Sequence, residues 1–452
     1  SLTKTSCLSC GKCIDVCPVG ALMQRTVHYK FNPHPKDISL QNCGLCGVGC
    51  FIQTETQAGI VTRVTTPQEE PAFNGKNLCF KGRFGWQSFY DKDRLKVPLF
   101  KENGIFKKIS WQEVTDLIAK EISLCSSKRF EISPYISLEE MLMLQRAAHK
   151  YETELSANPV FSAFSDVFLN LSPQKEPYKI LDKFEQYVVY GELNQVLATL
   201  IRLQQRKGKK LTLVNYPENA FCRFADAVYA NLAEVQATDK TLFIYNQNRI
   251  SEQEAFALWC FASEQGTDNL LVSTDFRNHL GFLALQPDFS PSSSDFVLSW
   301  GVYPALANQA KFSVAIMPFE DEKAPVDLLI PAPSFLEMEG TALSDLGQIT
   351  KSANPAKSII INELMRLFYT LNWIHPNSAE VPFWNQEAEK LLLTLQNYVP
   401  AKFEPSAVKI AELSKTIKFI PAQAEKYITA LFEQGKKATS FSGRLISSSA
   451  NM

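Results

Sequence analysis

Glycine and histidine are scarce in this chain of 452 residues, and the glycine-rich loops that bind nucleotides are missing. The 19 glycines form neither a GxGxxG nor a GxxxxGK motif, the two loops through which proteins commonly hold the phosphates of NAD and ATP. The five histidines show no spacing typical of a metal site. We therefore expect a partner to carry any nicotinamide or ATP chemistry.

The sequence also lacks a long apolar run and an excess of charge of one sign. No apolar run reaches the roughly 20 residues that a membrane-spanning helix needs, and Ser1 to Ser6 lack the apolar core of a secretory signal. The formal net charge of −1 gives no electrostatic basis for binding nucleic acid or anionic lipid. We expect a cytoplasmic protein, or one held at the membrane periphery through partners.

Cysteine, in contrast, is concentrated at one end of the chain. Eight of the 11 cysteines lie within the first 79 residues. They form two sets of four, namely Cys7, Cys10, Cys13 and Cys17, then Cys43, Cys46, Cys50 and Cys79. Such clustering suits a reducing compartment, and thiolates at these spacings ligate [4Fe–4S] clusters, which carry single electrons. The scattered Cys125, Cys222 and Cys260 are expected to be structural thiols.

The first set has the spacing Cys-x2-Cys-x2-Cys-x3-Cys-Pro, from Cys7 to Pro18. Zinc sites favour separated CxxC pairs or Cys/His pairs, whereas this spacing matches the bacterial ferredoxin run, in which the fourth cysteine ligates the other cluster of a two-cluster fold. No second CxxCxxC run precedes it. Either Cys17 ligates a further cluster together with an upstream segment, which we favour, or it closes its own cluster.

The second set begins with Cys43 to Cys50 (CGLCGVGC) and is closed by Asn77 to Gly85 (NLCFKGRFG). Glycine between the thiols permits positive φ and close approach of backbone N–H groups to cluster sulfurs. Residues 51–54 and 59–64 alternate like a β-hairpin. With its closing Cys-x-Lys-Gly-Arg-Phe, this stretch resembles the cluster domain of the molybdopterin oxidoreductase superfamily, and most of all NAD-linked formate dehydrogenase catalytic subunits. The large iron–sulfur subunit of respiratory complex I belongs to the same superfamily.

The resemblance implies a role for Lys81. In the superfamily the matching position lies between the cluster and the pterin and relays electrons. The alternative is a surface lysine whose charge only tunes the cluster. The run Val326 to Thr341 (VDLLIPAPSFLEMEGT) is also similar to a superfamily signature, so the resemblance extends to about residue 350.

Residues 100–355 predict an α/β body, because short apolar strands alternate with longer amphipathic segments. This alternation implies largely parallel sheets covered by helices. The expected strands are 187–190, 211–214, 242–245, 270–273, 296–299, 312–316 and 326–330, and the expected helices are 138–150, 195–206 and 252–262. We expect a ferredoxin-type segment at 1–38, a cluster domain at 39–99, the formate-dehydrogenase-like body at 100–355 and a helical C-terminal region at 356–452.

The body departs from the enzymes of the superfamily. Their metal-ligating cysteine or selenocysteine and nearby histidine have no counterpart in Asn158 to Asp166, where only a serine or an aspartate is left as a candidate ligand. Only Gly191 and Gly301 follow predicted strands at which glycine loops would hold a pterin pyrophosphate. Residues 356–452 do not resemble the cap that completes the cofactor site. We expect two [4Fe–4S] clusters, no molybdopterin and no catalytic residue.

The sequence thus predicts an electron-transfer subunit of a multi-subunit NAD(P)H-linked oxidoreductase, similar to complex I, a bifurcating hydrogenase or a transhydrogenase. Expected partners are a flavin subunit that oxidises NAD(P)H, other iron–sulfur subunits, and a ferredoxin or hydrogenase module. The first alternative is a fragment of a molybdenum- or tungsten-dependent formate dehydrogenase catalytic subunit. The second is a structural scaffold whose clusters are not redox-active.

Overall fold

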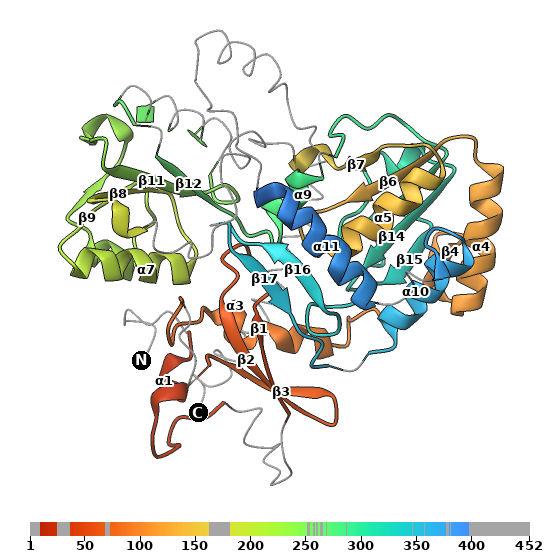
Figure 1. Cartoon of the computed structure of the whole chain (residues 1–452), viewed down its shortest axis with the longest axis horizontal. Helices are drawn as coiled ribbons and strands as arrows, with labels where there is room; N and C mark the ends of the chain where they lie inside the picture. Colours follow the sequence, from red (N-terminus) through yellow and green to blue (C-terminus); the bar gives the residue numbers. More distant parts are fainter. Residues whose placement is uncertain are drawn as a thin grey trace.

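The computed structural model describes four stretches of the chain, residues 10–24, 37–67, 73–161 and 181–396. Within the last stretch, residues 251–253, 256–257, 259–260, 263–264, 268, 286, 346, 357, 377–378 and 380 are also outside the description. Figure 1 shows three groups of elements: the red and orange N-terminal elements, a yellow-green sheet with one long helix, and a larger sheet surrounded by helices.

The N-terminal group contains the short helix α1 (Lys12–Val16) and an antiparallel sheet in the order β1-β2-β3. Its strands are β1 (Asp37–Asn42), β2 (Phe51–Gln57) and β3 (Ile60–Thr65). The expected hairpin is β2 and β3, joined through Ala58 and Gly59 at φ of 51° and 77°, a left-handed pair that suits a tight hairpin turn. The helix α3 (Phe80–Phe84) and the 3-10 turn η2 (Gly85–Tyr90) follow.

Five strands of the body form a wholly parallel sheet in the order β10-β9-β8-β11-β12. They are β8 (Gln186–Tyr190), β9 (Lys210–Val214), β10 (Ala227–Tyr229), β11 (Thr241–Asn246) and β12 (Leu270–Ser273). The helix α7 (Gln195–Arg206) connects β8 to β9, as parallel neighbours require a crossover. Every residue of β11 is buried, which explains the continuous apolar run at residues 242–245.

Seven further strands form a second, mixed sheet in the order β5-β4-β15-β14-β13-β6-β7. They are β4 (Leu99–Glu102), β5 (Ile105–Lys108), β6 (Lys128–Ile132), β7 (Leu155–Ala157), β13 (Phe296–Trp300), β14 (Phe312–Met317) and β15 (Leu328–Pro331). The five strands from β15 to β7 are parallel, and β4 joins β15 in the antiparallel sense. The helices α4 (Trp111–Leu124) and α5 (Leu138–Lys150) each begin with a capping box, formed by Ser110 with Glu113 and by Ser137 with Glu140.

The hairpin of β16 (Gly340–Leu343) and β17 (Ile349–Ser352) lies between the larger sheet and the N-terminal group (Figure 1). The Lys351 backbone N–H donates to Asn42 Oδ1 at 3.0 Å, and the Ala353 N–H donates to Gln41 Oε1 at 2.8 Å. The remaining helices are α9 (His279–Ala284), α10 (Ile360–Thr370) and α11 (Val381–Gln396), and the remaining 3-10 turns are η3 (Pro159–Phe161), η5 (Ala220–Phe224), η6 (Leu232–Glu234) and η7 (Ala307–Gln309).

The α/β class is confirmed, and so is a helical C-terminal region as far as residue 396; the expectation for 397–452 lies outside the described residues. All seven expected strands are present, and the helices at 138–150 and 195–206 have the expected bounds. The expected helix 252–262 falls partly outside the description, and its described residues are helical. Within the described stretches, no helix is long and apolar enough to cross a membrane.

Candidate cluster-binding site

Three thiols of the second set lie in the loop that joins β1 to β2. Cys43, Cys46 and Cys50 are buried, with 7%, 8% and 4% of their surface exposed. The Cys43 N–H donates to the Cys50 carbonyl at 2.7 Å, which closes the loop upon itself. Asn42 Nδ2 donates to the Gly49 carbonyl at 2.9 Å, so β1 holds the far side of the loop as well. The loop therefore holds three buried sulfur atoms in fixed positions.

The glycines of this loop are required by its close packing. A β carbon on Gly47 would lie 2.0 Å from Asp345 Oδ1, and Gly49 has a φ of +63°. The Asp345 N–H also donates to the Gly47 carbonyl at 2.7 Å, and Asp345 Oδ2 accepts from the Thr274 N–H at 2.7 Å. A side chain at position 47 would break these contacts, so the segment after β16 and the end of β12 together fix the loop.

The fourth thiol, Cys79, precedes α3 and caps its N-terminus. The Gly82 N–H donates to Cys79 Sγ at 3.2 Å. A β carbon built on Gly82 would lie 3.6 Å from Cys79 Sγ and 3.8 Å from Cys43 Sγ, so both sulfur atoms border the same piece of backbone. Asn194 Nδ2, at the start of α7, donates to Cys46 Sγ at 3.4 Å. The structure thus brings all four predicted residues of the second set together, with N–H donors beside two of the sulfurs.

The electrostatics of the four thiols are those of a site that needs a cation. Burial raises the pKa of Cys43 to about 12, and burial also raises the pKa of Cys79. Burial, followed by repulsion from the neighbouring thiolates, raises the pKa of Cys46 and Cys50 well above the ordinary value. At Cys79 the Gly82 N–H and then the Lys81 charge oppose this rise. Four close thiolates in a low-dielectric interior require positive charge, and the iron of a [4Fe–4S] cluster supplies it.

The donor set fits such a cluster: four cysteine sulfurs, with backbone and amide N–H groups directed at the sulfurs. Among the described residues, no group of three or more His, Cys, Asp or Glu side chains is arranged to hold a single metal ion. Ligation by Cys43, Cys46, Cys50 and Cys79 stays a prediction.

The first set has a different environment. Cys7 lies outside the described residues, Cys10 and Cys17 are partly buried, and Cys13 is exposed. Cys17 ends α1, and backbone N–H groups of residues 19–22, with that of Leu22 contributing most, lower the pKa of its thiol. This arrangement suits a thiolate ligand. Whether Cys17 closes its own cluster or reaches a further one stays open, as does ligation by the other three.

Lys81 lies on α3, two residues after Cys79, and is partly buried. Its charge lowers the pKa of Cys79, which is the charge-tuning effect that the sequence offered as one interpretation. The relay role stays a prediction, because it depends on a second redox group on the far side of the lysine.

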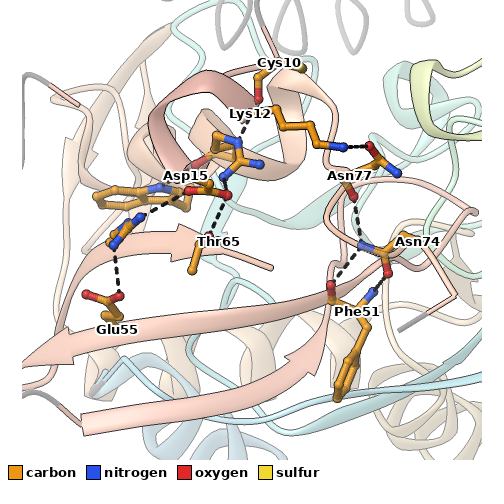
Figure 2. Close-up of polar contacts among 11 residues, drawn as sticks. Cys10, Lys12, Asp15, Phe51, Glu55, Thr65, Asn74 and Asn77 are labelled. Atoms are coloured by element: carbon orange, nitrogen blue, oxygen red, sulfur yellow. Dashed lines mark hydrogen bonds and ion pairs between the residues drawn. The ribbon is translucent and has the colours of Figure 1, made fainter. Parts of the chain in front are cut away.

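The structure also places near the two sets several residues that were not predicted. Asn194 contacts Cys46 although 148 positions separate them. Asp15, between Cys13 and Cys17, contacts Arg83, which stands in the Cys-x-Lys-Gly-Arg-Phe motif. Figure 2 shows Asp15 in contact with Thr65, and Lys12 in contact with Asn77. Asp15 and Arg83 lie close to cysteines along the chain, and that closeness was their only signal in the sequence. Asn194 had no such signal.

The two glycines that follow strands of the body face protein side chains. Gly191, after β8, has a φ of +67°, and its β carbon would lie 2.7 Å from Ile250 Cγ2. Gly301, after β13, has a φ of +79°, and its β carbon would lie 2.4 Å from Ser133 Oγ. Residues 158–166 correspond to the stretch that carries the metal ligand in the superfamily's enzymes. Its first part, Asn158 to Phe161, lies at η3, and residues 162–166 are outside the description.

Comparison with known proteins identifies two domains at the N-terminal end. Residues 42–91 match the Molybdopterin oxidoreductase Fe4S4 domain, and residues 3–23 match the 4Fe-4S binding domain. The expected resemblance to the molybdopterin oxidoreductases and the expectation of [4Fe–4S] clusters are thereby confirmed. The matches cover both cysteine sets and leave the whole body, residues 100–355, unassigned.

Among curated proteins, the chain is 33% identical over 143 residues to an NADH-quinone oxidoreductase subunit of Rhizobium meliloti, which covers 31% of this chain and 17% of that protein. It is 31% identical over 147 residues to NADH-quinone oxidoreductase subunit 3 of Thermus thermophilus, covering 32% and 18%. NADPH-Fe(3+) oxidoreductase subunit alpha of Geobacter sulfurreducens is 33% identical over 96 residues, covering 21% and 11%. The chain thus spans less than a fifth of the length of these relatives.

Among solved structures, the formyltransferase/hydrolase complex FhcABCD from Methylorubrum extorquens has a TM-score of 0.43 and 10% sequence identity. The superposition covers 65% of this chain and 99% of that chain. So distant a likeness carries no functional argument.

Proposed function

We propose that this chain is an electron-transfer iron–sulfur subunit of a multi-subunit oxidoreductase. The observation that carries the proposal is the cluster of three buried thiols, Cys43, Cys46 and Cys50, with the partly buried Cys79, within the stretch that matches a molybdopterin oxidoreductase Fe4S4 domain. A second cysteine segment, matching a 4Fe-4S binding domain, packs directly against it. Two adjacent cluster sites would form a path for electrons.

The cluster, when bound, accepts and returns one electron at a time. The chain's own part is to hold the iron through the four thiolates and to set the cluster's electrostatic surroundings. The Gly82 N–H at Cys79 and the Asn194 amide at Cys46 donate to sulfur atoms whose negative charge grows on reduction. The Lys81 charge acts in the same direction. These groups favour the reduced state and raise the reduction potential.

The packing of the body supports a subunit without a pterin of its own. The spaces beside Gly191 and Gly301 are filled by Ile250 and Ser133, so these two loops do not present the open backbone that a pyrophosphate needs. A molybdenum- or tungsten-dependent formate dehydrogenase fragment is the second candidate, favoured by the same domain match and by a relative of Bacillus subtilis that is called a putative formate dehydrogenase.

The proposed electron donor is a flavin subunit that oxidises NADH or NADPH. The relatives include NADH-quinone and NADPH-Fe(3+) oxidoreductase subunits, and the sequence contains neither of the two common nucleotide loops. Other iron–sulfur subunits, a ferredoxin or a hydrogenase module would receive the electrons. The protein would act in the cytoplasm or at the membrane periphery.

Metal analysis and EPR spectroscopy of the anaerobically purified protein test the proposal. We expect about eight iron atoms per chain, which corresponds to two [4Fe–4S] clusters, and EPR signals of reduced clusters upon addition of dithionite. Stoichiometric molybdenum or tungsten would instead establish the formate dehydrogenase alternative. Clusters that stay oxidised under dithionite and during turnover of the assembled complex would establish a structural scaffold.

A further inference from the structure

An arginine of the second cysteine set makes direct contact with the first set. Arg83 lies on α3, four residues after Cys79, and its guanidinium forms an ion pair with Asp15 of α1. Its Nε also donates to the backbone carbonyl of Cys10 at 2.7 Å. Figure 2 shows dashed contacts at Cys10 and at Asp15, the latter joined also to Thr65. The Arg83 side chain thus connects α3, which follows the predicted ligand Cys79, to the backbone of Cys10, a predicted ligand of the first set.

The ion pair is buried and its carboxylate has several partners. The side chains of Arg83 and Asp15 are 2% and 6% exposed. Asp15 also accepts from Thr65 Oγ1 at 2.8 Å and from Arg63 Nη2 at 3.1 Å, both on β3. Arg63 in turn lies 3.5 Å from Glu55 of β2. Because its neighbours come from β3 and α3, the Asp15 carboxylate can occupy this position only when α1 is docked.

The backbone around the pair is fitted just as closely. Gly11 has a φ of +70°, and a β carbon there would lie 2.6 Å from both Arg83 Cδ and Phe84 Cζ. The Arg83 backbone is itself fixed, because its N–H donates to the Cys79 carbonyl at 3.1 Å and its carbonyl accepts from Trp86 Nε1 at 3.0 Å. Arg83 therefore links the backbone at Cys79 to the segment that carries Cys10, so that the two keep a fixed relative position.

A second connection ends beside Cys50. Lys12 Nζ donates to Asn77 Oδ1 at 2.7 Å, and Asn74 Nδ2 donates to the Asn77 carbonyl at 2.9 Å. Asn74 Oδ1 also accepts from the Phe51 N–H at 2.9 Å. Figure 2 shows this chain of contacts from Lys12 to Phe51, the residue that follows Cys50. The first cysteine segment is thus connected to the second ligand set at two places, beside Cys79 and beside Cys50.

We propose that Arg83 and Asp15 are positioning residues that hold the two cluster segments at a fixed separation and thereby permit electron transfer between them. The proposal rests on the proposed function, in which both segments carry clusters. In the step concerned, one electron leaves one reduced cluster, which is oxidised by one unit, and enters the other, which is reduced by one unit. No bond forms and no proton is transferred. Because electron tunnelling falls steeply with distance, a docked α1 gives fast transfer and a released α1 gives slow transfer.

The test uses the cluster-loaded chain and compares Arg83→Met with the wild type. The exposed Arg366, which pairs with Glu363 on α10, provides the matched control Arg366→Met. After full reduction with dithionite, two nearby paramagnetic clusters broaden each other's EPR signals and relax each other. We expect this interaction to disappear in Arg83→Met, to persist in Arg366→Met and to return in part in Arg83→Lys, while the iron content and the separate signals stay unchanged.

Hydrogen exchange provides a second readout that needs no reduction of the clusters. Amide exchange in residues 10–24 should rise roughly tenfold or more in Arg83→Met and in Asp15→Asn, because local opening becomes easier. Unchanged spin interaction together with unchanged exchange would overturn the proposal. If Arg83→Met loses iron, the spin interaction and the amide exchange of Asp15→Asn and Arg83→Lys decide whether the proposal holds. Clusters that cannot be reduced in the wild type would contradict the proposed function, whereas the exchange result would still decide whether the pair docks α1.

Discussion

The two cysteine sets carry similar ligands in opposite surroundings. The second set lies in a buried loop whose thiols have raised pKa values, whereas in the first set Cys13 is exposed and the pKa of Cys17 is lowered by backbone N–H groups. The buried site depends on its metal for charge compensation, while the exposed site is stabilised by water and backbone dipoles. The difference suggests that the second set is part of the folding core and the first is a module docked on it.

The largest effect that would sharpen this comparison comes from removing one thiol of each set. Cys43→Ser should eliminate the second cluster, about four iron atoms, and should lower the stability by several kcal/mol, because metal-binding energy in a buried site is folding energy. Cys13→Ser should eliminate a cluster of the same size with little loss of stability. Iron analysis combined with thermal unfolding measures both. Equal losses of stability in the two variants would contradict a difference between core and module.

The same glycine substitution in each set provides the next comparison. Gly47→Ala would place a β carbon 2.0 Å from Asp345 Oδ1, and we expect a loss of about 3 kcal/mol from overpacking. Gly20 has a φ of +66°, but its nearest atom, Met23 Sδ, is 4.0 Å away, so Gly20→Ala should cost only about 1 kcal/mol of backbone strain. Chemical denaturation of both variants gives the two values. A cost for Gly20→Ala as large as that for Gly47→Ala would mean that packing does not distinguish the sets.

Iron release should follow the same order. With an iron chelator present under air, the first set should lose its iron roughly tenfold faster than the second, because the second is reached only by local opening of the core. Samples taken over time, freed of oxygen and reduced with dithionite, give the EPR signal that is left at each site. Loss of both signals at one rate would show that the sets open together.

Much of the fold was predictable from the sequence because its signals are local. The strands β8, β9 and β11 are short apolar runs, the hairpin of β2 and β3 alternates, and α5 and α7 are amphipathic segments with the bounds that the sequence indicates. The strands β4 and β5 belong to the larger sheet only through the pairing of β4 with β15, more than 200 residues away, and no local pattern encodes that pairing. The sequence predicted largely parallel sheets, but for the same reason it did not assign the strands to one sheet or the other.

The candidate site shows the same limit. Spacing pointed to seven of the eight cysteines as candidate ligands, because cluster ligation imposes short, regular gaps, and the Cys-x-Lys-Gly-Arg-Phe motif added Cys79. Asn194, which contacts Cys46, and Asp345, which packs against Gly47, come from distant segments and carry no spacing signal. The pairing of Asp15 with Arg83 spans 68 positions. Local chemistry was therefore predictable, and the groups that position it were not.

The smallest expected effect concerns charge beside each set. Lys81 lies next to the partly buried Cys79 and its charge acts to lower the pKa of that thiol, while Lys12 precedes the exposed Cys13. A unit charge near a partly buried partner contributes about 1 kcal/mol after screening, which for a one-electron couple is about 40 mV. Lys81→Met should therefore lower the potential of the second cluster by about 40 mV, with only a moderate dependence on salt, because a partly buried pair is screened less than an exposed one. Lys12→Met should shift the first cluster less, and high salt should remove the shift. Redox titrations followed by EPR at low and high salt measure all four values, and equal, salt-sensitive shifts would show that Cys79 is electrostatically as exposed as Cys13.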